Sequence, residues 1–268
     1  MNEGDHLSFE VSYNKKVVIP SSPLGLNVDN RILGKGVSVT PVMSQSGNGI
    51  KTYEVKHTDG SLLYVDVRES DDGVAFRYRL PADGPKCIYG EQTTFTFPND
   101  TKVWYASGPF QYGWIQAYQE RNISTVDNEL LAPPATFQLP DGCYAAITEA
   151  NLFNFHGAVL LGEKGNKVRF GYVENKGHLE TGSITGIPDA RYYHEVVKNV
   201  PWIVYPTAGA KEIKTPWRIL MLADDLNGLV NNKIIASVSD QPDKKLFPDG
   251  AKTSWIKPGR KSSSVQGP

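Results

Sequence analysis

The sequence predicts an all-β protein, a large and mainly antiparallel β-sandwich with one short helix near its C-terminus. Apolar and polar residues alternate over many short segments, which is the period-2 pattern of strands that bury one face. Dipeptides such as Asp59-Gly60, Asp72-Gly73 and Asp141-Gly142 separate these segments, and they favour the tight turns of β-hairpins. Helical periodicity is scarce. These observations together favour neighbouring antiparallel strands.

The expected strands follow one another along the chain. Phe9, Val11 and Tyr13 alternate with polar residues, and a second apolar run follows, so two strands are expected to join near Asn14. A second hairpin is expected to turn at Asp72-Gly73. Further strand patterns occupy residues 63–68, 74–80, 95–97, 144–149, 168–172 and 217–222.

The expected helix begins near Asp224 or Asp225, whose side chain can cap its N-terminus. Its apolar stripe consists of Leu226, Leu229, Val230 and Ile234. The strand at 217–222 is apolar on both faces, so we expect this stripe to cover it. Residues 260–268 are polar and flexible in composition. They are predicted to form a disordered tail after a single domain at 1–259.

Composition narrows the classes of partner. The chain has 268 residues, enough to bury a large core, and its 28 lysines and arginines are balanced by 29 acids. This balance provides no basic surface for nucleic acid. No apolar run is long enough to span a membrane, and the first ten residues lack the features of a signal peptide. Cys87 and Cys143 are equally compatible with one disulfide and with two thiols.

Glu149 is the main candidate for a functional group. It stands at the end of the predicted strand 144–149, where an apolar pattern meets a polar and aromatic turn. An ionised Glu is almost never fully buried unless it is paired or binds a metal, so Glu149 is a candidate ligand or acid-base group. The structural alternative is a carboxylate that caps backbone N–H groups at the strand end.

Aromatic residues are concentrated between Trp104 and Tyr118. Flat rings with polar edges suit sugar rings, whose C–H groups are apolar and whose hydroxyls need hydrogen-bond partners. Trp114 and Tyr118 are therefore candidates for contact with a sugar. The structural alternative is that these rings fill the core of the sandwich. No nucleophile elbow, P-loop or dinucleotide motif is present, and the histidines show no metal-ligand pair.

Four motifs point to a known family. Ser22-Pro-Leu-Gly-Leu26, Ile147-Thr-Glu-Ala-Asn-Leu152, Thr215-Pro-Trp-Arg218 and Ser254-Trp-Ile-Lys-Pro-Gly259 occur in the order and spacing of the N-terminal domain of glycoside hydrolase family 97. The chain resembles that domain from about residue 7 to residue 259. The resemblance implies a β-super-sandwich that packs on a catalytic (β/α)₈ barrel, in calcium-dependent α-glucosidases and α-galactosidases that are periplasmic or secreted.

The resemblance also implies roles for particular residues. Glu149 matches the glutamate that this domain contributes to the calcium site, and the partners implied are an α-linked glycoside or oligosaccharide and the barrel. No catalytic residue is expected here, because the carboxylates that cleave the glycosidic bond resemble groups of the barrel. Asn151 stands where the family usually has Asp. The expectation is a non-catalytic domain, inactive alone, and the alternative is a free-standing carbohydrate-binding sandwich.

Overall fold

A computed structural model describes residues 6–42, 49–107, 117–177, 193–198, 201–206, 209–241 and 245, and for 173–177 and 193–198 it describes the backbone alone. Within these residues the fold is all-β and antiparallel, as predicted. The expected segment 254–259 and the tail 260–268 lie outside the described residues. Trp114 lies outside them too.

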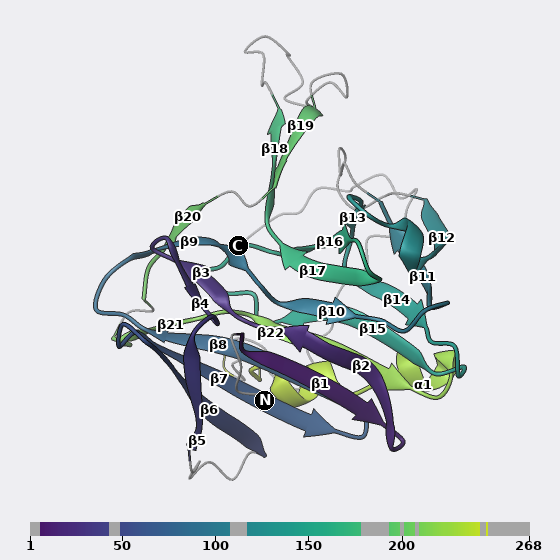
Figure 1. Ribbon diagram of the computed structural model, residues 1–268, viewed down its shortest axis with the longest axis horizontal. Coiled ribbons are helices and arrows are strands. Elements are labelled where there is room, and N and C mark those ends of the chain that lie inside the picture. The colour runs from purple at the N-terminus through teal and green to yellow at the C-terminus, as the bar shows by residue number, and fades with distance from the viewer. Residues whose placement is uncertain are drawn as a thin grey trace, which may run out of the picture.

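The largest sheet forms one layer of the sandwich (Figure 1). Its strands, in spatial order, are β12 (Tyr118–Asn122), β11 (Lys102–Ala106), β14 (Ala135–Gln138), β15 (Tyr144–Ala150), β22 (Trp217–Ala223), β8 (Gly73–Pro81), β7 (Leu62–Ser70), β6 (Ile50–His57) and β5 (Val37–Val42), and β21 (Glu212–Lys214) also pairs with β8. Every pairing in this sheet is antiparallel.

Smaller sheets cover one face of this layer (Figure 1). One consists of β10 (Thr94–Thr96), β17 (Lys167–Gly171), β16 (Val159–Glu163) and β13 (Leu130–Leu131), and another of β20 (Trp202–Val204), β9 (Lys86–Glu91), β3 (Leu26–Val28) and β4 (Arg31–Leu33). The hairpins are β1 (Ser8–Tyr13) with β2 (Lys16–Pro23), and β18 (Val173–Gly177) with β19 (Tyr193–Lys198).

The predicted turns form where the sequence places them. β1 and β2 join at Asn14, and β7 and β8 join through Asp72-Gly73. Gly73 has φ of 131°, and a Cβ there would lie 2.1 Å from the carbonyl oxygen of Leu220. The turn therefore requires glycine both for its backbone conformation and for its close approach to β22.

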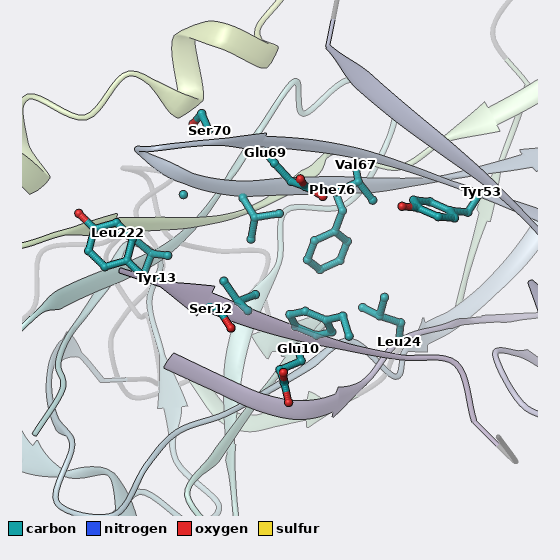
Figure 2. Close-up of a pocket in the computed structure, with 14 residues that line it drawn as sticks. Glu10, Ser12, Tyr13, Leu24, Tyr53, Val67, Glu69, Ser70, Phe76 and Leu222 are labelled. Atoms are coloured by element: carbon teal, nitrogen blue, oxygen red, sulfur yellow. The ribbon is translucent and has the colours of Figure 1, made fainter. Parts of the chain in front are cut away.

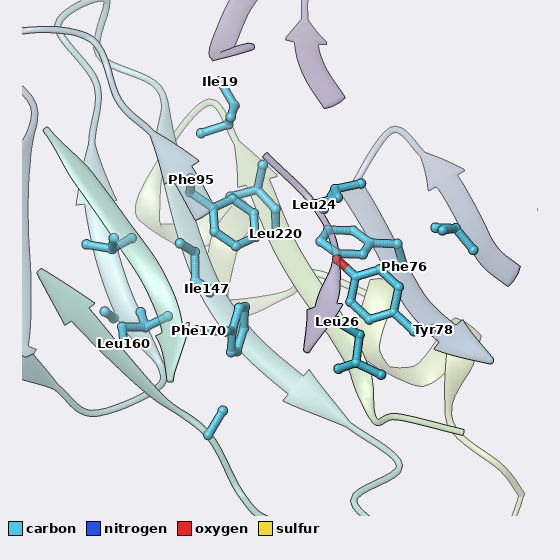
Figure 3. Close-up of a cluster of buried hydrophobic side chains, with 14 of the residues drawn as sticks. Ile19, Leu24, Leu26, Phe76, Tyr78, Phe95, Ile147, Leu160, Phe170 and Leu220 are labelled. Atoms are coloured by element: carbon cyan, nitrogen blue, oxygen red, sulfur yellow. The ribbon is translucent and has the colours of Figure 1, made fainter. Parts of the chain in front are cut away.

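The main core lies between the large sheet and the smaller sheets (Figure 3). Phe95 and Phe170 come from the second layer, and they face Ile147, Leu220 and Phe76 of the large sheet. Phe95 contacts Phe76 and Phe170 at ring-centroid distances of 6.3 and 5.9 Å. These contacts join three strands that are distant in the sequence.

Two short helices cover the other face of the large sheet, α1 (Leu226–Val230) and α2 (Ile234–Val238). Asp225 caps α1 as predicted, since its Oδ1 accepts a hydrogen bond of 2.7 Å from the Gly228 N–H. Trp217 is 1% exposed and packs against α2, so the strand is buried on both faces as expected.

One detail of the helix prediction is wrong. Leu226 and Val230, which were expected to cover the strand, are 54% and 84% exposed. The helix breaks after Val230, where the Asn232 side chain bonds the carbonyl oxygen of Asp72 and the Ile234 N–H. Because of this break, Leu229 and the residues of α2 provide the cover instead.

The two cysteines, Cys87 and Cys143, are both free thiols, which resolves the alternatives that the sequence left open. No described helix is long and apolar enough to cross a membrane.

Candidate functional site

Glu149 lies at the end of β15, opposite Arg218 on the neighbouring strand β22. Arg218 Nη1 donates a 2.6 Å hydrogen bond to Glu149 Oε2, and the Ala158 N–H donates a 3.0 Å bond to Oε1. The Glu149 side chain is 14% exposed, whereas that of Arg218 is 0% exposed. The carboxylate is therefore held at the surface by groups that are themselves buried.

Arg218 is the centre of this buried cluster. Its guanidinium also pairs with Glu91 at the end of β9, and its Nη2 donates to the hydroxyl oxygen of Tyr172, which follows β17. The Tyr172 hydroxyl in turn donates to Glu91. One cation thus links the large sheet to both smaller four-stranded sheets.

The polar groups of the cluster have further hydrogen-bond partners deeper in the core. Thr93 Oγ1 donates a 2.7 Å hydrogen bond to Glu91 Oε2, and it lies 2.7 Å from the Tyr78 hydroxyl oxygen. The Gly25 N–H donates to that same tyrosine oxygen at 3.0 Å. Buried charges are tolerated only when they are paired and hydrogen-bonded in this way. The network therefore fixes the positions of its members.

The charges in the cluster do not cancel. Glu91 and Glu149 provide two carboxylates for the single guanidinium of Arg218, so one formal negative charge remains. Burial raises the pKa of Glu149, although the charge of Arg218 and the Ala158 N–H act in the opposite direction. For Arg218, burial lowers the pKa, but the neighbouring carboxylates outweigh it and raise the pKa overall. Of the two carboxylates, only Glu149 reaches the surface, where a further cation can contact it.

The loop after Glu149 is held at both ends. Asn151 Nδ2 donates to the carbonyl oxygen of Val238 at 3.2 Å, and its Oδ1 accepts from the Asp240 N–H at 3.1 Å. Asn151 thus anchors the loop to the end of α2. Further along, His156 stacks on Trp202 with ring centroids 4.6 Å apart. Both side chains lie beside the buried cluster, because Trp202 also contacts Tyr172 at 4.3 Å.

The rim of the site is apolar and exposed. Leu152 and Phe153, which follow Glu149 in the chain, are 46% and 67% exposed. Large exposed apolar side chains beside a charged group are typical of a surface that another structure covers.

Tyr118 lies on the opposite face of the large sheet from Glu149. Directly paired residues share a face, and Tyr118 is paired with Ala106 on β11. Trp104, two residues from Ala106, is paired with Thr136 on β14, which is paired with Ala146 on β15, so all of these side chains lie on one face. Successive side chains of a strand point to opposite faces, so Glu149 is on the other face. Tyr118 is 65% exposed, whereas Tyr105, another aromatic residue of the segment between Trp104 and Tyr118, is fully buried.

A calcium ion needs six to eight oxygen ligands. Among the described residues, no group of three or more His, Cys, Asp or Glu side chains is placed to hold a metal ion. Glu149 fits the role of one ligand, since it is a carboxylate at the surface whose two oxygens each accept one hydrogen bond and keep unused lone pairs. Glu91 does not fit, because it is fully buried against Arg218.

Comparison with known proteins identifies the family. Residues 1–241 match the family model described as "Glycosyl-hydrolase 97 N-terminal". The chain belongs to this family. This glycosyl hydrolase 97 N-terminal domain spans only part of the length of the relatives that it matches. It is 27% identical to a "Probable retaining alpha-galactosidase" of Streptomyces bingchenggensis, over 94% of this chain and 36% of that protein. It is 22% identical to a "Retaining alpha-galactosidase" of Bacteroides thetaiotaomicron, over 96% of this chain and 41% of that protein.

Solved structures of other proteins share the fold. A family 97 enzyme from Pseudoalteromonas sp. strain K8 in complex with acarbose matches with a TM-score of 0.63 and 20% identity, over 90% of this chain and 36% of that chain. A β-arabinopyranosidase matches with a TM-score of 0.60 and 20% identity, over 82% and 37%. The glycosyl hydrolase 97 N-terminal domain thus spans little more than a third of each of these proteins.

Two residues of the site were missed by the sequence interpretation. Arg218 stands within a strand that is apolar on both faces, and a charged residue there signals a buried partner. That signal was available. Glu91 carries no comparable signal, because only the tertiary fold brings β9 to β22.

Proposed function

We propose that this chain is the non-catalytic N-terminal domain of a calcium-dependent α-glycosidase, an α-glucosidase or an α-galactosidase. In the whole enzyme it contributes Glu149 as one calcium ligand and part of the wall of the sugar-binding pocket. A (β/α)₈ barrel supplies the catalytic carboxylates. The proposal includes a periplasmic or secreted location.

The observation that carries the proposal is the unbalanced charge of the buried cluster. Glu91 and Glu149 share the single guanidinium of Arg218, so two carboxylates of the cluster face one positive charge. A calcium ion against Glu149 would supply the missing positive charge. The fixed guanidinium and the Ala158 N–H would hold the carboxylate in one orientation for that ion.

The remaining ligands must come from outside the described residues. One carboxylate provides at most two of the six to eight oxygen ligands that calcium takes. A domain that packs over Leu152 and Phe153 would bring further oxygen donors to Glu149 and would cover this apolar rim. A catalytic barrel in that position would place its sugar pocket beside the calcium ion.

The substrate of the whole enzyme and its sugar contacts are also part of the proposal. Solved relatives of the fold are complexes with panose and with acarbose, so an α-linked glycoside or oligosaccharide is the proposed substrate of the whole enzyme. Trp114 and Tyr118 remain candidates for contact with sugar. Tyr118 would act on the face of the sheet that Glu149 does not share.

The second candidate is a free-standing carbohydrate-binding sandwich. The exposed ring of Tyr118 is the observation in its favour. A free-standing module would be polar outside a narrow aromatic strip, whereas Leu152 and Phe153 expose a further apolar surface next to Glu149. This surface favours the domain of a larger enzyme.

The first test is an assay of glycoside hydrolysis. The purified chain is expected to release no aryl leaving group from aryl α-glucosides or aryl α-galactosides, with calcium or with a chelator, because glycoside cleavage needs two carboxyls at a set separation across the bond. Calcium-stimulated turnover by the chain, abolished in Glu149→Gln, would show that it carries a complete active site and would overturn the proposal.

A further inference from the structure

A cavity of about 270 Å³ lies between β1 and the large sheet (Figure 2). Phe76 points from the sheet towards β1, and Tyr53 enters from one end. Neither Glu149 nor Arg218 lines this cavity. It is therefore separate from the site described above. Its size, just below that of pockets for drug-sized ligands, suits a ligand of one small ring.

The backbone of β1 forms one wall of the cavity. Five consecutive residues, Phe9 to Tyr13, line it. The side chains of Phe9, Val11 and Tyr13 pack towards the core, whereas those of Glu10 and Ser12 are exposed, so the run lines the cavity with its backbone as well as with side chains. Within the described chain β1 pairs with β2 alone, so the other edge presents its N–H and C=O groups unpaired.

A free strand edge usually suits another strand, but this edge is irregular. The register of β1 against β2 shifts between Phe9 and Val11, and again between Val11 and Ser12. Such bulges increase the local twist and are a common means of preventing an edge strand from pairing further. The geometry therefore favours a small ligand over an added peptide strand.

The chemistry of the lining selects the ligand. The lining contains no Lys, Arg or His, and the nearby ammonium of Lys51 is already paired with Glu69, so an anionic ligand would meet no free cation of the lining. Backbone N–H groups donate, backbone C=O groups and Glu69 accept, and the Tyr53 hydroxyl, which has no hydrogen-bond partner among the described residues, can do both. Hydroxyl groups match this mixture because each can donate and accept.

The remaining walls are apolar. Val67 and Phe76 are 8% and 3% exposed, and Val74 is half-buried. Carbon-bound hydrogens of a ring could lie against these side chains while its hydroxyls meet the strand edge and Glu69. A neutral sugar has both kinds of surface. A purely apolar ligand would leave the free backbone groups unpaired, at a cost in free energy.

We propose that this cavity binds a single neutral sugar ring. The binding site is separate from the proposed calcium ligand and needs no catalytic barrel, because its walls belong to β1, β6, β7, β8, Leu24 and Leu222 of this chain.

The test is a titration of the ¹⁵N-labelled chain with methyl α-glucopyranoside and methyl α-galactopyranoside, followed by NMR. At least one of them is expected to cause saturable shifts of amides at 9–13 and 67–76. Tyr53→Phe removes only the hydroxyl and should weaken binding about three- to tenfold. Tyr64→Phe is the matched control, because this tyrosine also lies in the sheet but does not line the cavity. It should bind like the wild type.

A second variant fills the space. Val74→Trp should fill the cavity and abolish the sugar-induced shifts, provided that its spectrum shows a folded chain. If this variant does not fold, Tyr53→Phe alone decides the question. The shifts should be the same with calcium and with a chelator, so failure here is distinct from failure of the proposed calcium role. Absence of saturable shifts with both sugars, shifts that map elsewhere, or unchanged affinity in Tyr53→Phe would overturn the inference.

Discussion

Arg218 Nη1 donates a hydrogen bond of 2.6 Å to Glu149 Oε2 across two adjacent strands, and the arginine side chain is completely buried. The pair is a directly opposed cross-strand pair in an antiparallel ladder. Since Arg218 is also paired with Glu91 in the core, it cannot leave Glu149 without disrupting the network. The surface carboxylate is thereby fixed by the interior of the domain.

Removal of Arg218 should destabilise the domain. Arg218→Met leaves Glu91 buried without its cation, and breaking a buried pair by removing one partner costs about 3–5 kcal/mol. Urea denaturation measures this loss. Arg121→Met, at an arginine whose side chain is 44% exposed, is the control and should change stability by less than about 0.5 kcal/mol. A double variant with Glu91→Gln should regain part of the loss. Equal stability of Arg218→Met and the wild type would contradict the buried ion pair between Arg218 and Glu91.

Trp217 should be an essential core residue. It belongs to one buried cluster with Ala75 and residues of α2 and is 1% exposed, so Trp217→Ala should cost about 3–5 kcal/mol. Tyr118→Ala removes another large ring from the same sheet, but that ring is 65% exposed and its loss should change stability by less than about 0.5 kcal/mol. Thermal melts compare the two variants. A harmless Trp217→Ala would mean that β22 is not integral to the sandwich.

Asp66 should make stability depend on pH. Burial alone would raise the pKa of Asp66, but hydrogen bonds and charge from Arg79, with Thr52 and Arg77, lower it overall. The folded state then binds fewer protons than the unfolded state. Asp66 therefore contributes stability above its unfolded pKa, and this contribution is lost as the pH falls through the lower folded pKa.

The measurement is the free energy of unfolding between about pH 6 and the acid limit of folding, for the wild type and Asp66→Asn. The variant should be less stable near neutral pH and should lose less stability on acidification. Parallel pH profiles for the two proteins would contradict the assigned lowering of the pKa of Asp66.

The sequence predicted those parts of the fold that depend on local chemistry. Asn14 and Asp72-Gly73 mark turns because their backbone conformations are properties of these residues, and the alternation around them fixes which side chains are buried. The cap at Asp225 is local in the same sense. The exposure of Leu226 and Val230 was not predicted, since Asn232 breaks the helix through a hydrogen bond to Asp72, far away in the sequence.

The candidate site was predictable only in part. Glu149 could be singled out from its own strand, but its partner Glu91 depends on the contact between two sheets. The placement of Tyr118 and Glu149 on opposite faces depends on a register carried through four strands, and no local pattern encodes it.

The central claim is that Glu149 is a ligand in a calcium site that this domain completes only in part. A calcium titration of the ¹⁵N-labelled chain, followed by NMR, tests it most directly. The wild type should bind calcium with a dissociation constant of about 1 mM or weaker, because most oxygen ligands are missing. Shifts should centre on the amides of residues 149–158 and disappear in Glu149→Gln, while Glu120→Gln, at an exposed carboxylate on β12, should behave like the wild type. Shifts that persist in Glu149→Gln, or micromolar binding by the chain, would contradict the account.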